Sequence, residues 1–326
     1  MKDIHFGIVP REWGDFFQEA YEQIKVAEKT GFESVWFEEH HSNEYYLPCP
    51  IDALNAIATH TNLKLGTSIV ILPLYHPLRL AEQIAQLDVL THGRVILGVG
   101  AGYREKDFEN FGIMLDERGT YMDEGLILLD KLLSQDKVTF YGKKYILKDA
   151  EVLPKPVQKP RPPIWVGGWK KTAIRRAAKF GDAWFPGPVG TISEVLNDKK
   201  IYEEELGKLN KKITTLPIMR DIYVTETDDK ALKESEESFN YMYGIDYSTS
   251  GHPLLGQTQM KFKDWAYDRF LIGSPSTIIE IVDKLVKNGF NYFVLRFSLR
   301  KLTNDQINNS IRLFGEKVIT YFKNER

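Results

Sequence analysis

The chain has 326 residues, with 43 lysines and arginines against 45 aspartates and glutamates, one cysteine and 43% hydrophobic residues. That length can bury a large core, either in two domains or in one large α/β barrel. A net charge of −2 argues against nucleic-acid partners, since proteins that bind nucleic acids concentrate basic residues. The single Cys49 excludes a disulfide within the chain and suits the reducing cytosol.

We expect no targeting or membrane-spanning segment. The first residues lack the apolar core of a signal peptide, and no stretch approaches the roughly 20 apolar residues that span a bilayer. The expectation is therefore a soluble cytoplasmic protein that binds neither a membrane nor nucleic acid.

Short apolar runs alternate with amphipathic stretches along the chain. Eight runs predict strands at 4–9, 34–37, 65–72, 95–99, 164–166, 182–185, 216–225 and 290–297. Helices are predicted at 16–29, 52–60, 77–91, 118–133, 172–180, 192–209, 229–243, 274–288 and 305–322. The segment 104–112 is predicted to be a loop.

Two segments interrupt this alternation. Residues 138–152 predict a hairpin that turns at 141–143, and the aromatic, aperiodic segment 239–270 predicts an inserted loop that could act as a lid. The remaining pattern predicts the α/β class and a (β/α)8 TIM barrel with these insertions, as a single domain over 1–326. The alternative is a doubly wound sheet with a helical appendage.

Active sites of such barrels lie where the strands end, so the strand exits carry the candidate residues. The second strand ends in Glu38-Glu39-His40-His41, and histidine is a common proton carrier near neutral pH. Neighbours in an extended backbone point to opposite faces, which weakens a metal site, and the chain has no HExxH motif. We predict no metal site, and either a catalytic histidine or a polar strand-end loop.

Two further strand exits are rich in glycine. Gly98-Val99-Gly100-Ala101-Gly102-Tyr103 lacks the dinucleotide-binding spacing, so it predicts either a smooth wall for a flat ligand or a tight strand exit. Gly167-Gly168-Trp169-Lys170-Lys171-Thr172 leads into a helix and predicts either an anion or phosphate site or ordinary helix capping.

Arg220 and Arg296 are charges inside otherwise apolar strands. A charge there is costly unless it is paired, so each predicts either a substrate contact or a salt bridge to Asp221 or Asp246.

Taken together, these residues resemble the bacterial luciferase-like superfamily of flavin-dependent monooxygenases. The strongest parts of the match are the runs 31–41, 67–77 and 83–102, with Asp107-Phe108 and Gly273-Ser274-Pro275. The resemblance implies a (β/α)8 barrel with an insertion over its mouth, commonly dimeric. It also implies that a separate NAD(P)H-dependent flavin reductase supplies reduced FMN. The flavin would react with O2 to a C4a-hydroperoxyflavin, which oxygenates a small organic substrate. The aromatic residues of the segment 239–270 predict that this substrate is apolar.

The resemblance also implies roles for individual residues. His40 matches the catalytic histidine, with Glu39 steering its ring, and Ser68-Ile69 matches a non-proline cis peptide. The flavin cleft corresponds to Gly100, Ala101, Gly102 and Tyr103, and the phosphate loop to Gly167, Gly168, Trp169, Lys170 and Thr172. Arg220 matches an arginine near the substrate pocket in relatives of the alkanesulfonate type.

The chain also departs from luciferase proper. It has Gly100-Ala101 in place of a Cys-Arg pair, and Gly168-Trp169 in place of an acidic-hydroxyl pair, so light emission from a long-chain aldehyde is not expected. The nearest alternative is a coenzyme F420-dependent oxidoreductase of the same superfamily, which moves hydride without oxygen. Those relatives more often carry Asp-His where this chain has Glu39-His40-His41, which favours FMN. A catalytically silent flavin-binding barrel is a further alternative.

Overall fold

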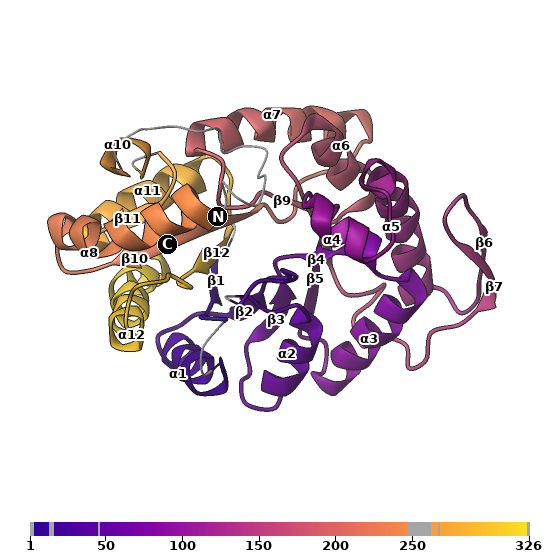
Figure 1. The fold of residues 1–326 in the computed structure, drawn as a ribbon, viewed down its shortest axis with the longest axis horizontal. Helices are drawn as coiled ribbons and strands as arrows, with labels where there is room; N and C mark the ends of the chain where they lie inside the picture. The colour runs from indigo at the N-terminus through magenta and orange to yellow at the C-terminus, as the bar shows by residue number, and fades with distance from the viewer. Residues whose placement is uncertain (1–2, 13–15, 45, 247–261, 267, 325–326) are drawn as a thin grey trace. The chain divides into compact units, whose positions relative to one another are not determined.

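The computed structural model describes residues 3–12, 16–44, 46–246, 262–266 and 268–324 (Figure 1). The chain divides into two compact units, each made of separate segments. Unit 1 comprises Met1–Trp36, Phe185–Ile201 and Ile213–Arg326, and unit 2 comprises Phe37–Trp184 and Tyr202–Lys212. The single domain expected over 1–326 stays a prediction.

Unit 1 contains a parallel sheet in which β11, β10, β12, β1 and β2 follow one another. These strands are β1 (His5–Val9), β2 (Ser34–Phe37), β10 (Pro217–Val224), β11 (Leu271–Gly273) and β12 (Tyr292–Arg296). The helices are α1 (Phe16–Lys29), α8 (Asp228–Tyr241), α10 (Phe262–Ala266), α11 (Pro275–Lys287), α12 (Asn304–Leu313), α13 (Thr320–Asn324) and the first part of α7 (Ile192–Lys208). Parallel strands that alternate with helices are the arrangement that the sequence predicts.

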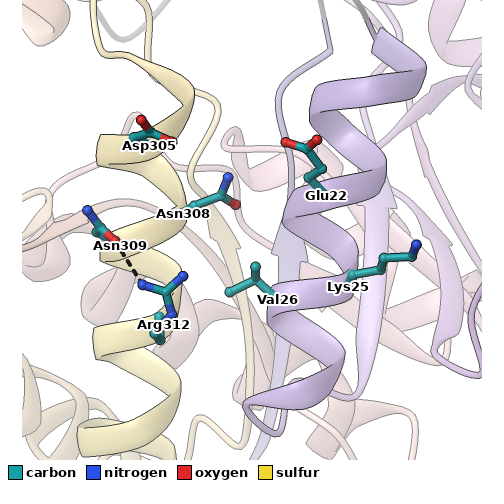
Figure 2. Close-up of a pocket in the computed structure, with 7 residues that line it drawn as sticks. All are labelled: Glu22, Lys25, Val26, Asp305, Asn308, Asn309 and Arg312. Carbon is teal, nitrogen blue, oxygen red and sulfur yellow. Dashed lines mark hydrogen bonds between the residues drawn. The ribbon is translucent and has the colours of Figure 1, made fainter.

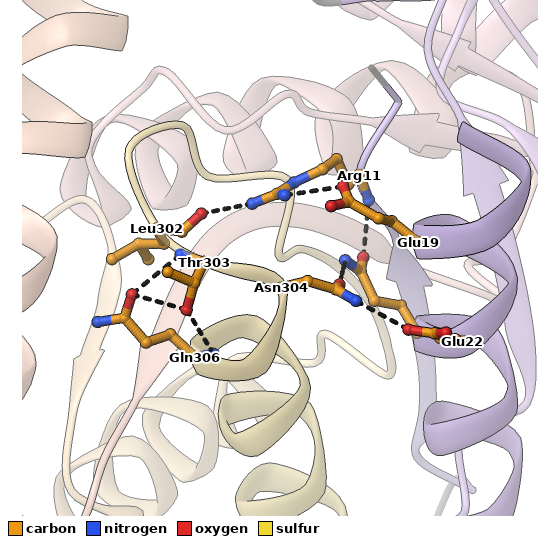
Figure 3. A network of polar contacts seen from close by, with 8 residues as sticks. Arg11, Glu19, Glu22, Leu302, Thr303, Asn304 and Gln306 are labelled. Carbon is orange, nitrogen blue, oxygen red and sulfur yellow. Dashed lines mark hydrogen bonds and ion pairs between the residues drawn. The ribbon is translucent and has the colours of Figure 1, made fainter. Parts of the chain in front are cut away.

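Helices α1 and α12 of unit 1 lie side by side and are tied by polar contacts at one end (Figures 1 and 3). The backbone N–H of Arg11 donates to the side chain of Gln23 (2.8 Å), whose amide donates to Asn304 (2.8 Å). Asn304 in turn donates to Glu22 (2.9 Å), and the Arg11 guanidinium donates to the carbonyl of Leu302 (2.6 Å). These contacts fix the start of the last long helix against the first.

Unit 2 contains the parallel strands β3 (Lys64–Thr67), β4 (Val70–Ile71), β5 (Val95–Gly100), β8 (Ile164–Gly167) and most of β9 (Ala183–Phe185). Both β3 and β4 pair with β5, which pairs with β8 on its other side. The helices are α2 (Pro50–Ile57), α3 (Pro77–Leu90), α4 (Glu105–Asn110), α5 (Arg118–Ser134), α6 (Lys171–Phe180) and the end of α7. Pro77 stands at the first position of α3, where a missing N–H costs nothing.

The hairpin predicted at 138–152 is present as β6 (Val138–Tyr141) and β7 (Ile146–Ala150), at the outer edge of unit 2 beyond α3 and α5 (Figure 1). Glu124 of α5 accepts the backbone N–H groups of Lys143 (2.7 Å), Lys144 (2.9 Å) and Tyr145 (3.1 Å). This one carboxylate therefore holds the whole hairpin turn.

Four expectations are corrected in detail. The strand expected at 65–72 is divided into β3 and β4 at Ser68-Ile69 and ends in a 3-10 turn, Leu72–Leu74. The loop expected at 104–112 contains α4, and the strand β11 was not expected; both are too short to show a period in the sequence. The segment 239–270 is partly helical: α8 passes into a π-helical turn, Met242–Asp246, and α10 follows. Residues 247–261 and 267 of the expected lid lie outside the described residues.

No helix among the described residues is long and apolar enough to cross a membrane.

Candidate active site

Glu39, two residues after β2, is the centre of a buried group of hydrogen bonds in unit 2. Its Oε1 lies 2.8 Å from His41 Nε2, while its Oε2 accepts the backbone N–H of Ile71 (3.0 Å) and the hydroxyl of Tyr75 (3.1 Å). The side chain is 0% exposed. Burial raises the pKa of the Glu39 carboxyl, and the hydrogen bonds from His41, Ile71 and Tyr75 act in the opposite direction. Tyr75 was not among the residues predicted for the site, although a hydroxyl-bearing residue shortly after a strand is a usable signal.

His41 is the histidine that Glu39 contacts. Its ring lies 4.7 Å from that of Phe111, and its backbone carbonyl accepts a hydrogen bond from Arg104 (2.8 Å). Arg104 also pairs with Asp107 at 3.5 Å. The hydrogen bond with Glu39 is the largest cause that raises the pKa of His41. Glu39 and His41 thus form a carboxylate–imidazole pair that favours the protonated imidazole.

His40 stands apart from this pair. Its half-buried ring lies 4.1 Å from the ring of Tyr46, and its backbone N–H donates to the carbonyl of Leu47 (3.0 Å). Glu39 was expected to steer the ring of His40, but the ring that it bonds is that of His41. The strand ends at Phe37, so the alternation of an extended backbone no longer governs these positions. The catalytic role of His40 stays a prediction.

The peptide bond between Ser68 and Ile69 is cis, as the resemblance implies. The glycines of β5 pack against this segment: a Cβ on Gly98 would lie 1.9 Å from the carbonyl oxygen of Thr67, and one on Gly100 would lie 2.8 Å from Ile69 Cδ1. The protein itself fills the space beside these two glycines, which fits the tight strand exit considered above. A flavin contact at this exit stays a prediction.

The loop after β8 leads directly into α6. Gly168 has φ +149°, and a Cβ there would lie 2.4 Å from the Cβ of Ala173, so close packing against the helix requires glycine. Lys170 is the N-cap residue of α6, and it is exposed together with Lys171 and Thr172. Two lysines and a hydroxyl at a helix N-terminus can hold an anion.

Two of the predicted exits meet in unit 2. The rings of Tyr103, after β5, and Trp169, after β8, lie 6.0 Å apart in an edge-to-face arrangement. The segment predicted to line the flavin ring is therefore next to the segment predicted to hold the phosphate.

The two strand arginines belong to unit 1, and both are 0% exposed. Arg296 is paired with Asp221, its register partner on β10, with Nη2 2.9 Å from Oδ2, which was one of the alternatives left open. Asp221 also accepts the hydroxyl of Tyr243. Arg220 donates through Nη1 to two backbone carbonyls, while its Nε and Nη2 are buried and without a hydrogen-bond partner among the described residues. Burial lowers the pKa of Arg220 to about 10.

A cleft of about 450 Å³ lies elsewhere in unit 1, between α1 and α12 (Figure 2). The residues that line it are Glu22, Lys25, Val26, Asp305, Asn308, Asn309 and Arg312, and none of the predicted site residues is among them. Within the described residues no group of three or more histidine, cysteine, aspartate and glutamate side chains could hold a metal ion.

The family model described as luciferase-like monooxygenase matches residues 9–292 of the chain. The chain belongs to this family. It is 23% identical to the alkanal monooxygenase alpha chain of Photorhabdus luminescens, over 93% of this chain and 90% of that protein. It is 25% identical to the F420-dependent glucose-6-phosphate dehydrogenase of Microbacterium testaceum, over 90% of each chain.

The solved structure of monooxygenase RslO1 from Streptomyces bottropensis matches with a TM-score of 0.84, at 22% identity, over 98% of this chain and 100% of that chain. This likeness confirms the predicted α/β fold of the TIM-barrel class. The luciferase-like family contains both FMN-dependent monooxygenases and F420-dependent oxidoreductases, so family membership establishes an oxidoreductase family and leaves the cofactor open.

Proposed function

We propose that this luciferase-like protein is a flavin-dependent monooxygenase that uses reduced FMN and O2 to oxygenate a small, apolar organic substrate. A separate NAD(P)H-dependent flavin reductase supplies the reduced FMN, and the protein acts as a homodimer in the cytoplasm. The contact between Tyr103 and Trp169 carries the proposal, because it joins two segments that would hold different ends of one flavin.

The residues after β5 and β8 fit FMN in their chemistry. The exposed Lys170, Lys171 and Thr172 at the start of α6 offer positive charge and donors for a phosphate group. The segment from Gly100 to Tyr103 begins at the last residue of β5, beside Ile69, and we assign it to the planar ring because the resemblance places the flavin ring there. In this arrangement Ser68, Ala101, Gly102, Gly167, Gly168 and Trp169 complete the cofactor-binding set.

Bound reduced FMN supplies the electrons for the reaction with oxygen, and the protein positions it and excludes water. His40 holds or transfers a proton at its imidazole ring. Glu39 contributes as a buried carboxylate. It holds the segment after β4 in place, because it bonds Ile71 and Tyr75 of that segment as well as His41.

Arg220 and Arg296 are assigned to substrate contact. Arg220 is the better candidate, because two of its guanidinium nitrogens are buried without a partner among the described residues and could donate to a polar group of the substrate. Arg296 is already paired with Asp221, so its contact with substrate would act alongside that pair.

An F420-dependent oxidoreductase is the second candidate, since an F420-dependent relative aligns over 90% of the chain. The two candidates differ in a measurable way, because hydride transfer to or from F420 consumes no oxygen. A catalytically silent flavin-binding barrel would bind FMN without turnover.

Oxygenation of substrate by the purified chain tests the proposal. The chain is given reduced FMN and a panel of alkanals, terpenes and alkanesulfonates, and binding of FMN and F420 is measured in parallel. Reduced FMN consumes O2 by itself to give hydrogen peroxide, so we expect a substrate-dependent oxygenated product in place of that peroxide. The yield of this product should fall about 10²–10⁴-fold in His40→Ala, a loss typical of a general acid or base. His60→Ala, in the exposed turn after α2, is the control. Preference for F420 without an oxygenated product, or tight FMN binding without turnover, would overturn the proposal.

A further inference from the structure

We propose that the β6–β7 hairpin is a positioning element of the active site, acting through Tyr145 and Tyr75 on the Glu39–His41 pair. The inference rests on the proposed function only in taking Glu39 as part of the active site. All of its contacts lie within unit 2.

Tyr145 links the hairpin to the segment after β4. It is the last of the three turn residues whose backbone N–H groups Glu124 accepts, and its side chain is buried. Its hydroxyl donates to the backbone carbonyl of Tyr75 (3.1 Å), and its ring packs edge to face against His76, at 5.5 Å and 83°. The ring of Tyr121 also packs edge to face with it, at 5.7 Å and 82°. The side chain is therefore fixed on several sides, so the position of the hairpin sets that of Tyr75.

Tyr75 passes this constraint to Glu39. Its backbone is held by Tyr145 and its hydroxyl donates to Glu39 Oε2 at 3.1 Å, the same oxygen that accepts the N–H of Ile71. The other carboxylate oxygen bonds His41. A shift of the hairpin would thus alter one of the three hydrogen bonds that share the buried carboxylate.

The charged groups around this path are few and can be named. His41 faces Glu39, Asp107 and Arg104. Tyr75 faces Glu39, Cys49 and Asp52, and Tyr145 faces Tyr121 and Glu124. Of these, Glu39 is the group that both His41 and Tyr75 contact directly. A shift of the hairpin should therefore change the protonation equilibrium of the Glu39–His41 pair.

Titration of the His41 ring by NMR tests the proposal, with the full-length chain labelled at histidine and without flavin. Tyr75→Phe removes one hydrogen-bond donor from the Glu39 carboxylate. The carboxylate then depends more on His41, and a protonated His41 stabilises it more than a neutral one does. We therefore expect the His41 signals to titrate at higher pH in Tyr75→Phe. Tyr145→Phe leaves the Tyr75 hydroxyl in place but removes the bond that holds the Tyr75 backbone. It should shift the titration in the same direction by a smaller amount. Tyr121→Phe removes a neighbouring hydroxyl and should leave the titration unchanged.

The double variant Tyr75→Phe/Tyr145→Phe should titrate like Tyr75→Phe alone, because both substitutions act through one hydrogen bond. If Tyr145→Phe is poorly folded, Glu124→Gln releases the turn from outside the path and should give the same upward shift. The proposal is overturned if His41 titrates in Tyr145→Phe as it does in the unsubstituted chain. If Glu124→Gln has to replace Tyr145→Phe, the same criterion applies to Glu124→Gln. Since no flavin is present, failure here would leave the proposed function intact, and failure of oxygenation would leave this result intact.

Discussion

Arg296 on β12 and Asp221 on β10 face each other across neighbouring parallel strands as a fully buried ion pair. Because the hydroxyl of Tyr243 also bonds Asp221, the carboxylate is satisfied from two sides. The pair lets the charges of Arg296 and Asp221 lie inside a largely apolar sheet, because each charge has its counterion beside it.

Asp221→Asn should destabilise the protein severely. The substitution leaves the guanidinium of Arg296 buried without a countercharge, which typically costs about 3–5 kcal/mol. Urea unfolding of the intact chain measures this loss. Glu236→Gln, which neutralises an exposed carboxylate on α8, should change the free energy of unfolding by less than about 0.5 kcal/mol. A loss of similar size in both variants would show that the pair is not specially important.

Gly98→Ala should be at least as damaging, for a steric reason. The new Cβ would lie 1.9 Å from the carbonyl oxygen of Thr67, and backbone atoms of a paired strand cannot move aside as a side chain can. We expect a loss of about 3 kcal/mol or more, at the upper end for overpacking. Gly207→Ala in α7 is the matched control, because nothing lies within 4 Å of its Cβ position. That variant should gain about 0.5–1 kcal/mol from helix propensity.

Removing the two lysines at the start of α6 tests the phosphate site. Lys170→Ala/Lys171→Ala should weaken FMN binding about 10–100-fold, the loss expected for one or two charge-assisted hydrogen bonds. Riboflavin lacks the phosphate, so its affinity should not change. Lys179→Ala, in the last turn of the same helix, is the control. Fluorescence titration with both flavins would contradict the assignment if the two affinities fell equally.

Stability should depend on pH through His41. Its pKa is raised in the folded state, chiefly by the hydrogen bond with Glu39, so its contribution is complete below its unfolded value of about 6.5. That contribution is lost as the pH rises through the raised value. The stability difference between the unsubstituted chain and His41→Gln should therefore be largest below about pH 6.5 and shrink as the pH rises above that value. Urea unfolding at several pH values measures it, and in a Glu39→Gln background the pH dependence should disappear.

The long periodic elements follow from the sequence almost to the residue. The helix expected at 16–29 coincides with α1, and Gly31 at φ +99° ends its turn as expected. Elements that depend on tertiary contacts were harder to predict. The strand β11 has three residues and is stabilised by pairing with β10, so its own sequence carries little signal.

The same limit applies to the candidate site. The residues Glu39, His40 and His41 are adjacent in the sequence, which shows that a polar cluster exists but not which histidine the carboxylate holds. That choice depends on Ile71 and Tyr75, more than 30 positions away, which take Glu39 Oε2 and leave Oε1 to His41. The direction of the backbone after the end of β2 decides which of the two histidines points toward Glu39.

The segment from the hairpin turn to the loop before β8 is anchored at both ends. Glu124 holds the turn, and Gln158 is bonded to Asp88 of α3 through its backbone N–H (3.0 Å) and its side chain (2.7 Å). The side chain of Gln158 also donates to the carbonyl of Val95 at the start of β5 (2.8 Å). Although it lies at the edge of the unit, the insertion is held at both ends. We therefore expect the amides of Lys143, Lys144 and Tyr145, which donate to Glu124, to exchange more slowly than those of an unanchored hairpin.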